Sequence, residues 1–265
     1  MSDHQLRFGG IARLYGERGA HIINNSHICV IGIGGVGSWA AEALARSGVG
    51  KITLVDLDDI CTTNINRQLH ALTSSIGKPK VDVMAERIRL INPECRVQCI
   101  EDFVTEENLM DIITSEFDYV LDAIDSVAIK TAIIAYCKRI KLPVITIGGA
   151  GGQSDPSKIE ITDLSKTYQD PLLAKVKNQL RRYHNFPSAD VKKQSKRKFG
   201  IDAVFSSEQL VYPDEQGNVC HSKQTGNGGM RLDCNQGFGA ITHVTATFAF
   251  FAVSKVIKKL IKSAA

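Results

Sequence analysis

Apolar and polar residues follow one another along the first 150 residues in a pattern that predicts strands and helices in turn. Short apolar runs typical of buried strands cover residues 27–32, 51–55, 96–100, 117–122 and 143–147. Before and between them, apolar positions three and four residues apart predict helices over 9–23, 38–47, 79–92 and 127–140. This alternation predicts an α/β fold, a mostly parallel sheet with flanking helices.

The pattern changes beyond residue 150. Residues 159–164 alternate between apolar and polar side chains and predict one more strand. We therefore divide the chain into a core over residues 1–150 and a C-terminal part of the same domain over 151–265.

A long apolar run near the C-terminus has two interpretations. Residues 237–253 contain no Asp, Glu, Lys or Arg, and four lysines follow between residues 255 and 262. This length and charge pattern is close to that of a membrane span. The threonines and His243 within the run favour the alternative, a buried helix over 240–262 that closes the domain.

A glycine-rich turn follows the first predicted strand. Gly34, Gly35 and Gly37 lie between the apolar run and the predicted helix that starts at residue 38. In this setting, backbone N–H groups and the positive end of the helix bind phosphate. Asp56 ends the second predicted strand about 20 residues later, where a carboxylate accepts the hydroxyls of a ribose. The two features together predict a nucleotide site at the carboxyl ends of the strands.

Acidic, amide and basic side chains cluster just after the second predicted strand. They are Asp58, Asn64, Arg67, Gln68 and Lys80. Nucleotidyl transfer uses carboxylates to hold Mg²⁺ and cations to neutralise charge that develops on phosphates, whereas a dehydrogenase needs no such cluster. The cluster favours ATP and Mg²⁺. A non-catalytic nucleotide-binding module and an NAD(P)-dependent oxidoreductase remain alternatives.

These motifs together resemble the E1-like family of adenylating enzymes, which includes ubiquitin-activating enzymes and the bacterial ThiF- and MoeB-type enzymes. The matching segments are residues 32–38, 56–58, 64–68, 77–80 and 121–125. The resemblance implies an E1-like (ThiF-type), Rossmann-like domain in which a substrate carboxylate is activated as its adenylate.

The resemblance also implies a role for each matching position. The expected nucleotide-binding set is Gly34, Gly35, Gly37, Asp56, Asp58, Asn64, Arg67, Gln68 and Lys80. In this scheme Asp56 holds the ribose. The triphosphate is contacted by Asn64, Arg67 and Lys80. Asp125 holds Mg²⁺ beside the reacting phosphate, so Arg67 and Asp125 are the expected catalytic pair.

Three further segments are most similar to a bacterial branch of the family that modifies tRNA. They are residues 7–16, 148–152 and 228–234. This resemblance implies a homodimer that uses ATP to cyclise, with loss of water, the threonylcarbamoyl group on adenosine 37 of ANN-decoding tRNA. The alternative within the family is adenylation of the C-terminus of a small sulfur-carrier protein, and a sulfur-transfer or acceptor protein stays open as a partner.

One departure from the family concerns the dimer. Some bacterial relatives place an arginine near the N-terminus into the partner subunit's ATP site. The aligned residue here is Gly10, with Arg7 and Arg13 close by. Which residue, if any, acts across the dimer stays open.

A basic segment over residues 175–198 is the expected contact for nucleic acid. Its candidate residues are Lys177, Arg181, Arg182, Lys192, Lys193, Lys196 and Arg197. The only acid between residues 175 and 198 is Asp190, although the net charge of the whole chain is just +4. Clustered cations neutralise phosphates, and the aromatic residues within the segment can stack on bases. A solvated helix with lysines at its edges is the alternative.

The cysteines allow two further expectations. The chain has seven of them without a Cys-x-x-Cys pair, so we expect reduced thiols, a cytoplasmic location and no zinc. The start of the sequence lacks the pattern of a signal peptide. Cys234 lies in a glycine-rich loop over 217–239, where E1-like enzymes often carry an acyl-accepting cysteine, so it is a candidate nucleophile. An unreactive, half-buried thiol is the alternative.

Overall fold

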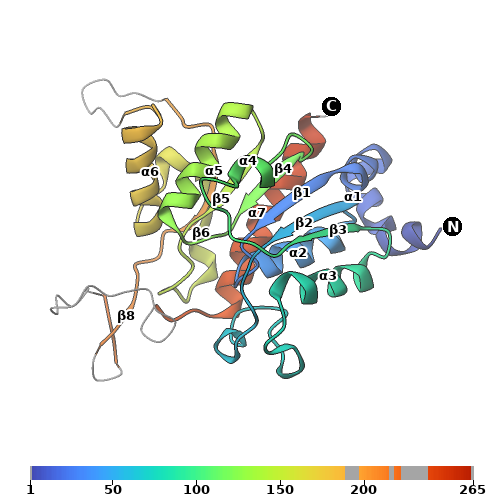
Figure 1. Cartoon of the computed structure of the whole chain (residues 1–265), viewed down its shortest axis with the longest axis horizontal. Helices are drawn as coiled ribbons and strands as arrows, with labels where there is room; N and C mark the ends of the chain where they lie inside the picture. Colours follow the sequence, from blue (N-terminus) through green and yellow to red (C-terminus); the bar gives the residue numbers. More distant parts are fainter. Residues whose placement is uncertain (1, 189–196, 215–217, 222–237, 264–265) are drawn as a thin grey trace.

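A seven-stranded sheet in the order β3-β2-β1-β4-β5-β7-β6 forms the centre of the molecule (Figure 1). This computed structural model describes residues 2–188, 197–214, 218–221 and 238–263. All neighbouring strands are parallel except β6 and β7. The strands are β1 (His27–Ile31), β2 (Lys51–Val55), β3 (Arg96–Ile100), β4 (Tyr119–Asp122), β5 (Val144–Ile147), β6 (Ile159–Asp163) and β7 (Asp202–Ser206). The predicted fold class is confirmed.

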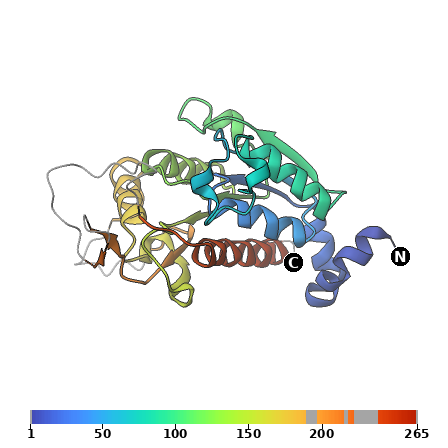
Figure 2. The ribbon, with the colours of Figure 1, turned by 90° about the horizontal axis from the view of Figure 1, so that it is seen from below.

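Helices cover both faces of the sheet, which gives three layers (Figure 2). One face packs against α2 (Gly37–Arg46), α3 (Lys80–Ile91) and α7 (Thr242–Ser263). The other packs against α4 (Leu109–Ile112), α5 (Val127–Ile140) and α6 (Pro171–Tyr183). The first helix, α1 (Asp3–Asn25), contacts α7, and a separate small hairpin pairs β8 (Tyr212–Pro213) with β9 (Val219–Cys220).

The composition of β1 explains why the central strands read as unbroken apolar runs. Every residue of His27–Ile31 is buried. Ile28 and Val30 belong to the core on one face, whereas Cys29 and Ile31 belong to the core on the other. A strand covered by helices on both faces needs apolar side chains at successive positions. The same covering leaves the carboxyl ends of the strands as the place for polar chemistry.

The structure corrects the predicted start of the first helix. The side chain of Ser2 accepts a hydrogen bond from the backbone N–H of Gln5, and the Gln5 side chain accepts one from the N–H of Ser2. This capping box starts α1 at Asp3 rather than at residue 9. The helix is interrupted at Gly16, whose φ of 76° lies in the left-handed region.

The apolar run near the C-terminus contributes most of its length to α7. Val244, Phe248 and Ala252 are buried in the core beside the sheet. Among the described residues, none of the helices has both the length and the apolar character that crossing a bilayer requires.

Candidate adenylation site

The glycine turn lies between the ends of β2 and β4, beside β1. The N–H of Gly32 donates to the carbonyl of Val55, and the N–H of Ala123 donates to the carbonyl of Ile31. The turn then folds back on itself, so a Cβ on Gly37 would stand 1.7 Å from the carbonyl oxygen of Gly32. Only glycine permits this approach. Since α2 begins at Gly37, its N-terminus faces the turn, which is the arrangement that binds phosphate.

A group of three charged side chains lies beside this turn. The Asp56 carboxylate accepts from the N–H of Ile33 at 2.6 Å and from the N–H of Asp58 at 2.9 Å. The Nζ of Lys80 is 2.6 Å from Oδ2 of Asp58 and 3.8 Å from Oδ1 of Asp56. Burial raises the pKa of Asp56, and the nearby Lys80 ammonium opposes that shift. The predicted Asp56, Asp58 and Lys80 are thus brought together with the turn.

The segment with Asn64, Arg67 and Gln68 covers the turn from the other side. The Asn64 side chain accepts from the N–H of Cys61, which orders the 3₁₀ helix η1 (Thr62–Asn64). The Cγ of Arg67 lies 3.3 Å from where a Cβ on Gly35 would stand. The Nε2 of Gln68 lies 3.9 Å from where a Cβ on Gly34 would stand, and the buried Oε1 of Gln68 has no partner among the described residues. This buried acceptor suits a site that holds a polar ligand.

Asp125 lies on the turn that joins β4 to α5 and is exposed. Its carboxylate makes no hydrogen bond or ion pair with the residues that the structure describes. The turn touches the glycine turn, because Ile124 and Ala123 lie within 3.1 Å of where a Cβ on Gly32 would stand. A free carboxylate at the rim of a phosphate-binding turn suits Mg²⁺, which binds through few carboxylates and the oxygens of phosphates. In the described part of the chain, no group of three or more His, Cys, Asp or Glu side chains is arranged to hold a metal alone.

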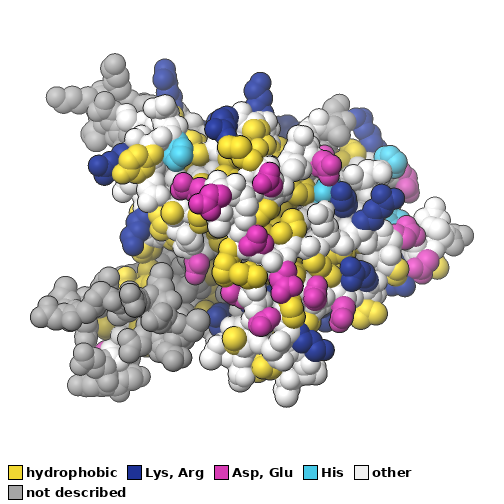
Figure 3. Space-filling view, in the orientation of Figure 1, with side chains coloured by type: hydrophobic (Ala, Val, Ile, Leu, Met, Phe, Trp, Pro, Cys, Tyr) yellow, Lys and Arg dark blue, Asp and Glu magenta, His cyan; other side chains and the backbone are white. Residues whose placement is uncertain are grey.

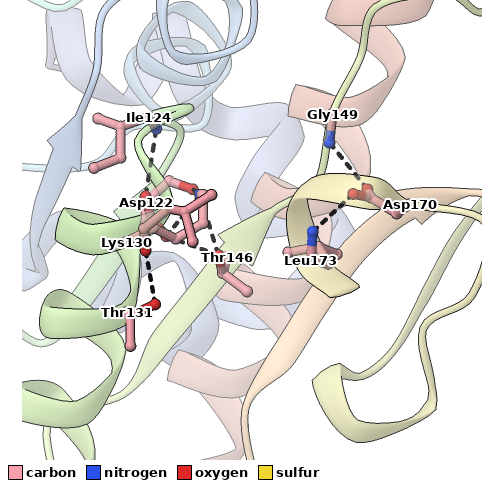
Figure 4. Close-up of polar contacts among 9 residues, drawn as sticks. Asp122, Ile124, Lys130, Thr131, Thr146, Gly149, Asp170 and Leu173 are labelled. Atoms are coloured by element: carbon pink, nitrogen blue, oxygen red, sulfur yellow. Dashed lines mark hydrogen bonds and ion pairs between the residues drawn. The ribbon is translucent and has the colours of Figure 1, made fainter. Parts of the chain in front are cut away.

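Two buried features of this region were not predicted from the sequence. His70 is 2% exposed, neither ring nitrogen has a partner among the described residues, and burial together with Lys80 lowers its pKa to about 4. Lys130 forms an ion pair with Asp122 behind the turn that bears Asp125 (Figure 4). The sequence does place Asp122 at the end of a predicted strand and Lys130 inside a predicted helix, but only the fold shows that the two side chains pair.

The basic segment divides into internal and exposed side chains. Lys177 donates to the carbonyl of Thr167, and burial followed by the neighbouring Arg181 lowers its pKa. Arg181 lies 5.2 Å above the ring of Phe199, whereas Arg182 and Arg197 are exposed. The remaining predicted residues, Lys192, Lys193 and Lys196, lie outside the described residues, as does Cys234.

A groove of about 800 Å³ runs between α5 and α6. Its lining includes Tyr136 and Arg139 from α5 and Tyr183 and His184 at the end of α6. The space-filling view shows Lys and Arg side chains around α6 and the adjacent end of α5 (Figure 3). Aromatic and basic side chains along one groove suit an RNA strand.

Comparisons with known proteins find relatives that match nearly the whole chain. The tRNA threonylcarbamoyladenosine dehydratase of Escherichia coli is 57% identical over 259 residues, covering 98% of this chain and 95% of that protein. The dehydratase of the same name from Haemophilus influenzae is 56% identical and covers 99% and 96% of the two chains. A crystal structure of the E. coli enzyme in complex with ATP superposes with a TM-score of 0.86 at 53% identity, covering 99% of this chain and 97% of that one.

A more distant relative is the sulfur carrier protein ThiS adenylyltransferase of E. coli, which is 37% identical over 49% of this chain and 52% of that protein. The similarity thus extends over the whole chain only for the dehydratases among these relatives. A model of the ThiF family matches residues 9–265. The chain belongs to the ThiF family.

Proposed function

We propose that this chain catalyses the ATP-dependent cyclising dehydration of N6-threonylcarbamoyladenosine at position 37 of tRNA, through a carboxyl adenylate. The observation that carries the proposal is the near-full-length similarity to dehydratases of that name, one of which has been solved with ATP and with AMP. AMP is the nucleotide product that is released when an acyl adenylate reacts further. The glycine turn and the charged side chains beside it, Asp56, Asp58 and Lys80, supply groups that suit the ribose and phosphates of ATP.

Binding of ATP uses groups at the ends of the first two strands. The N–H groups of the turn and the N-terminus of α2 receive phosphate oxygens. Asp56, which already accepts two backbone hydrogen bonds, has the position from which a carboxylate holds a ribose. Lys80 is almost fully buried and carries a positive charge next to these groups. The low dielectric constant around a buried side chain strengthens the attraction between this ammonium and a phosphate.

The chemical step joins AMP to the substrate carboxylate. The carboxylate attacks the α-phosphorus, pyrophosphate leaves, and Arg67 neutralises charge that develops on the phosphates. When bound at Asp125, Mg²⁺ would supply further charge neutralisation there. The carbamoyl group of the same side chain then attacks the acyl adenylate, the ring closes, and AMP leaves with the carboxylate oxygen. The attack is intramolecular, so positioning supplies most of the catalysis.

The tRNA interface is proposed along the groove between α5 and α6. Arg182 and Arg197 belong to the basic segment and are exposed, and Tyr183, the residue after Arg182, lines the groove. Together with Lys192, Lys193 and Lys196 they would neutralise backbone phosphates, whereas Lys177 has an internal partner. Arg139 and Arg182 stack over Tyr136 and Tyr183, which leaves planar groups for contact with bases.

The functional unit is proposed to be a homodimer. Phe250 and Phe251 on α7 are 48% and 38% exposed, and Leu14 on α1 is 70% exposed. The helices α1 and α7 contact each other, and large apolar side chains exposed on such helices are typical of an association surface. Sedimentation equilibrium of the wild type and a Phe250→Glu, Phe251→Glu variant tests this: the wild type is expected to sediment as a dimer and the variant as a monomer.

The proposed reaction is tested by its products. We expect the purified chain, incubated with ATP, Mg²⁺ and tRNA that carries the threonylcarbamoyl group, to release AMP and pyrophosphate and to yield a nucleoside lighter by one water. The same tRNA without this modification serves as the control. Release of ADP and phosphate contradicts the proposal. Pyrophosphate exchange stimulated by a carrier peptide ending in Gly-Gly, but not by tRNA, would instead favour the sulfur-carrier alternative.

A further inference from the structure

A fully buried charge network lies directly behind the turn that bears Asp125. The Nζ of Lys130 is 2.8 Å from Oδ2 of Asp122, and both side chains are 0% exposed. The hydroxyl of Thr146 donates to the same carboxylate oxygen at 2.7 Å and accepts from Lys130 at 3.2 Å. The three residues come from β4, α5 and β5, so the network joins three elements (Figure 4).

Stability alone gives a weak reason for such a network. Removing two charges from water costs several kcal/mol per ion, and apolar replacements of similar volume are often neutral or stabilising. A buried ion pair that is fully hydrogen-bonded does, however, fix the geometry of the groups that it joins.

The network extends into the turn itself. The second oxygen of Asp122, Oδ1, accepts from the N–H of Ile124 at 3.3 Å. At the other end of the turn, the N–H of Lys130 donates to the carbonyl of Ser126 in the first turn of α5. Asp125 lies between these two points. The side-chain network therefore reaches the turn through Ile124, the backbone of α5 fixes its other end, and the turn also touches Gly32.

We propose that Lys130, Asp122 and Thr146 are positioning residues that hold the β4–α5 turn in one orientation, so that the carboxylate of Asp125 faces the phosphates at the glycine turn. This inference rests on the proposed function, since it assigns to Asp125 the role given there. It explains why a lysine is fully buried in a helix whose other buried residues are mostly apolar. It also means that residues which would not touch the metal orient its proposed ligand, Asp125.

The sharpest test is Thr146→Val, which removes one hydroxyl and keeps the ion pair and the side-chain shape. Two measurements follow the turn directly. Amide hydrogen exchange of residues 123–126 is expected to accelerate, and the affinity of the complex with a non-hydrolysable ATP analogue for Mn²⁺, measured by electron paramagnetic resonance, is expected to fall about tenfold. The maximal rate of pyrophosphate release is expected to fall more than the KM for tRNA rises.

The matched control is Thr53→Val. Thr53 is also a fully buried strand threonine, and its hydroxyl contacts the Nε2 of His27 at 2.8 Å, away from the turn. This variant is expected to lose a similar amount of thermal stability without a change in exchange at residues 123–126 or in Mn²⁺ affinity. Lys130→Arg, which keeps the charge, is expected to retain more Mn²⁺ affinity than Lys130→Met.

Equal exchange and equal Mn²⁺ affinity in Thr146→Val and Thr53→Val would overturn the inference. Failure of the proposed function is distinguishable, because it would appear as a wild-type protein that releases no pyrophosphate. The exchange measurement does not depend on turnover and reports on the turn in either case.

Discussion

The half of the molecule around the glycine turn, where we propose that the nucleotide binds, and the half around β5, β6 and β7, where we propose that tRNA binds, are built in different ways. Around the glycine turn, most of the proposed functional groups lie within one short stretch of chain, from Gly32 to Lys80, and Asp125 follows the next strand, β4. In the other half, β5 pairs with β7 through Ile145 and Asp202, and β6 pairs antiparallel with β7. Phosphate binding demands particular backbone geometry, which restricts the local sequence. The half around β5, β6 and β7 depends on contacts between distant segments, so it leaves weaker local patterns.

The largest expected effect comes from removing the two charges that we propose to be catalytic, those of Asp125 and Arg67. We expect Asp125→Asn and Arg67→Ala each to lower the rate of pyrophosphate release by about 10²–10³-fold, because each removes charge stabilisation of the transition state. The KM for tRNA should change little. Steady-state pyrophosphate assays with modified tRNA measure both constants.

The control for this prediction is Asp111→Asn, since Asp111 is an exposed carboxylate in α4, away from the turn. It should match the wild type. If the Asp125 variant also matched the wild type, or if only the KM for tRNA changed, the assignment of Asp125 to the nucleotide half would be wrong.

A second test concerns the backbone of the turn. Gly37→Ala places a methyl group 1.7 Å from the carbonyl of Gly32, so we expect a loss of about 3 kcal/mol or more in the free energy of unfolding. Gly34 is the matched position, because the nearest atom to its added Cβ is Nε2 of Gln68 at 3.9 Å. Gly34→Ala should keep its stability and lose affinity for ATP. Urea unfolding and calorimetric titration separate the two effects, and equal stability of both variants would contradict the packing argument.

The two halves also differ in how far their structure could be predicted from the sequence. The strands at 51–55 and 96–100 have the predicted bounds, because alternating apolar positions, Ile52 and Leu54 in the first and Val97 and Cys99 in the second, define them. The strand β7 was not predicted, since Asp202–Ser206 forms a strand only by pairing with β5 and β6. Among the site residues, the motifs predicted that Asp56 and Lys80 lie in one site, and the structure places the two side chains 3.8 Å apart. The pairing of Lys130 with Asp122 was beyond reach, because nothing local links position 122 to position 130.

A third test uses the pH dependence of stability, and it concerns His70 beneath the glycine turn. Its pKa in the folded chain is about 4, below the ordinary 6.5. Between these values the unfolded chain binds a proton that the folded chain does not, so stability falls as the pH falls. From pH 7 to pH 5 this contribution amounts to about 2 kcal/mol.

The expected result is that His70→Gln loses about 2 kcal/mol less than the wild type over that pH range, by urea unfolding. The raised pKa values of Asp56 and Asp170 act in the opposite direction, but both carboxylates remain in both proteins and cancel in the difference. An identical loss in the two proteins would show that the imidazole is not buried in its neutral form.

The smallest expected effect separates the two halves by salt dependence. Arg182→Ala should weaken tRNA binding by about 1 kcal/mol and lower the slope of log affinity against log salt concentration by about 1, because one phosphate contact is lost. Lys177 is the matched control, because it is half-buried and its ammonium already donates to the carbonyl of Thr167. Lys177→Met should therefore reduce thermal stability and leave the salt slope unchanged. Filter binding at several salt concentrations measures both slopes. If Lys177→Met lowered the slope as much as Arg182→Ala, the internal partner of Lys177 would be given up on binding, and the basic face would extend further along α6 than its exposed residues indicate.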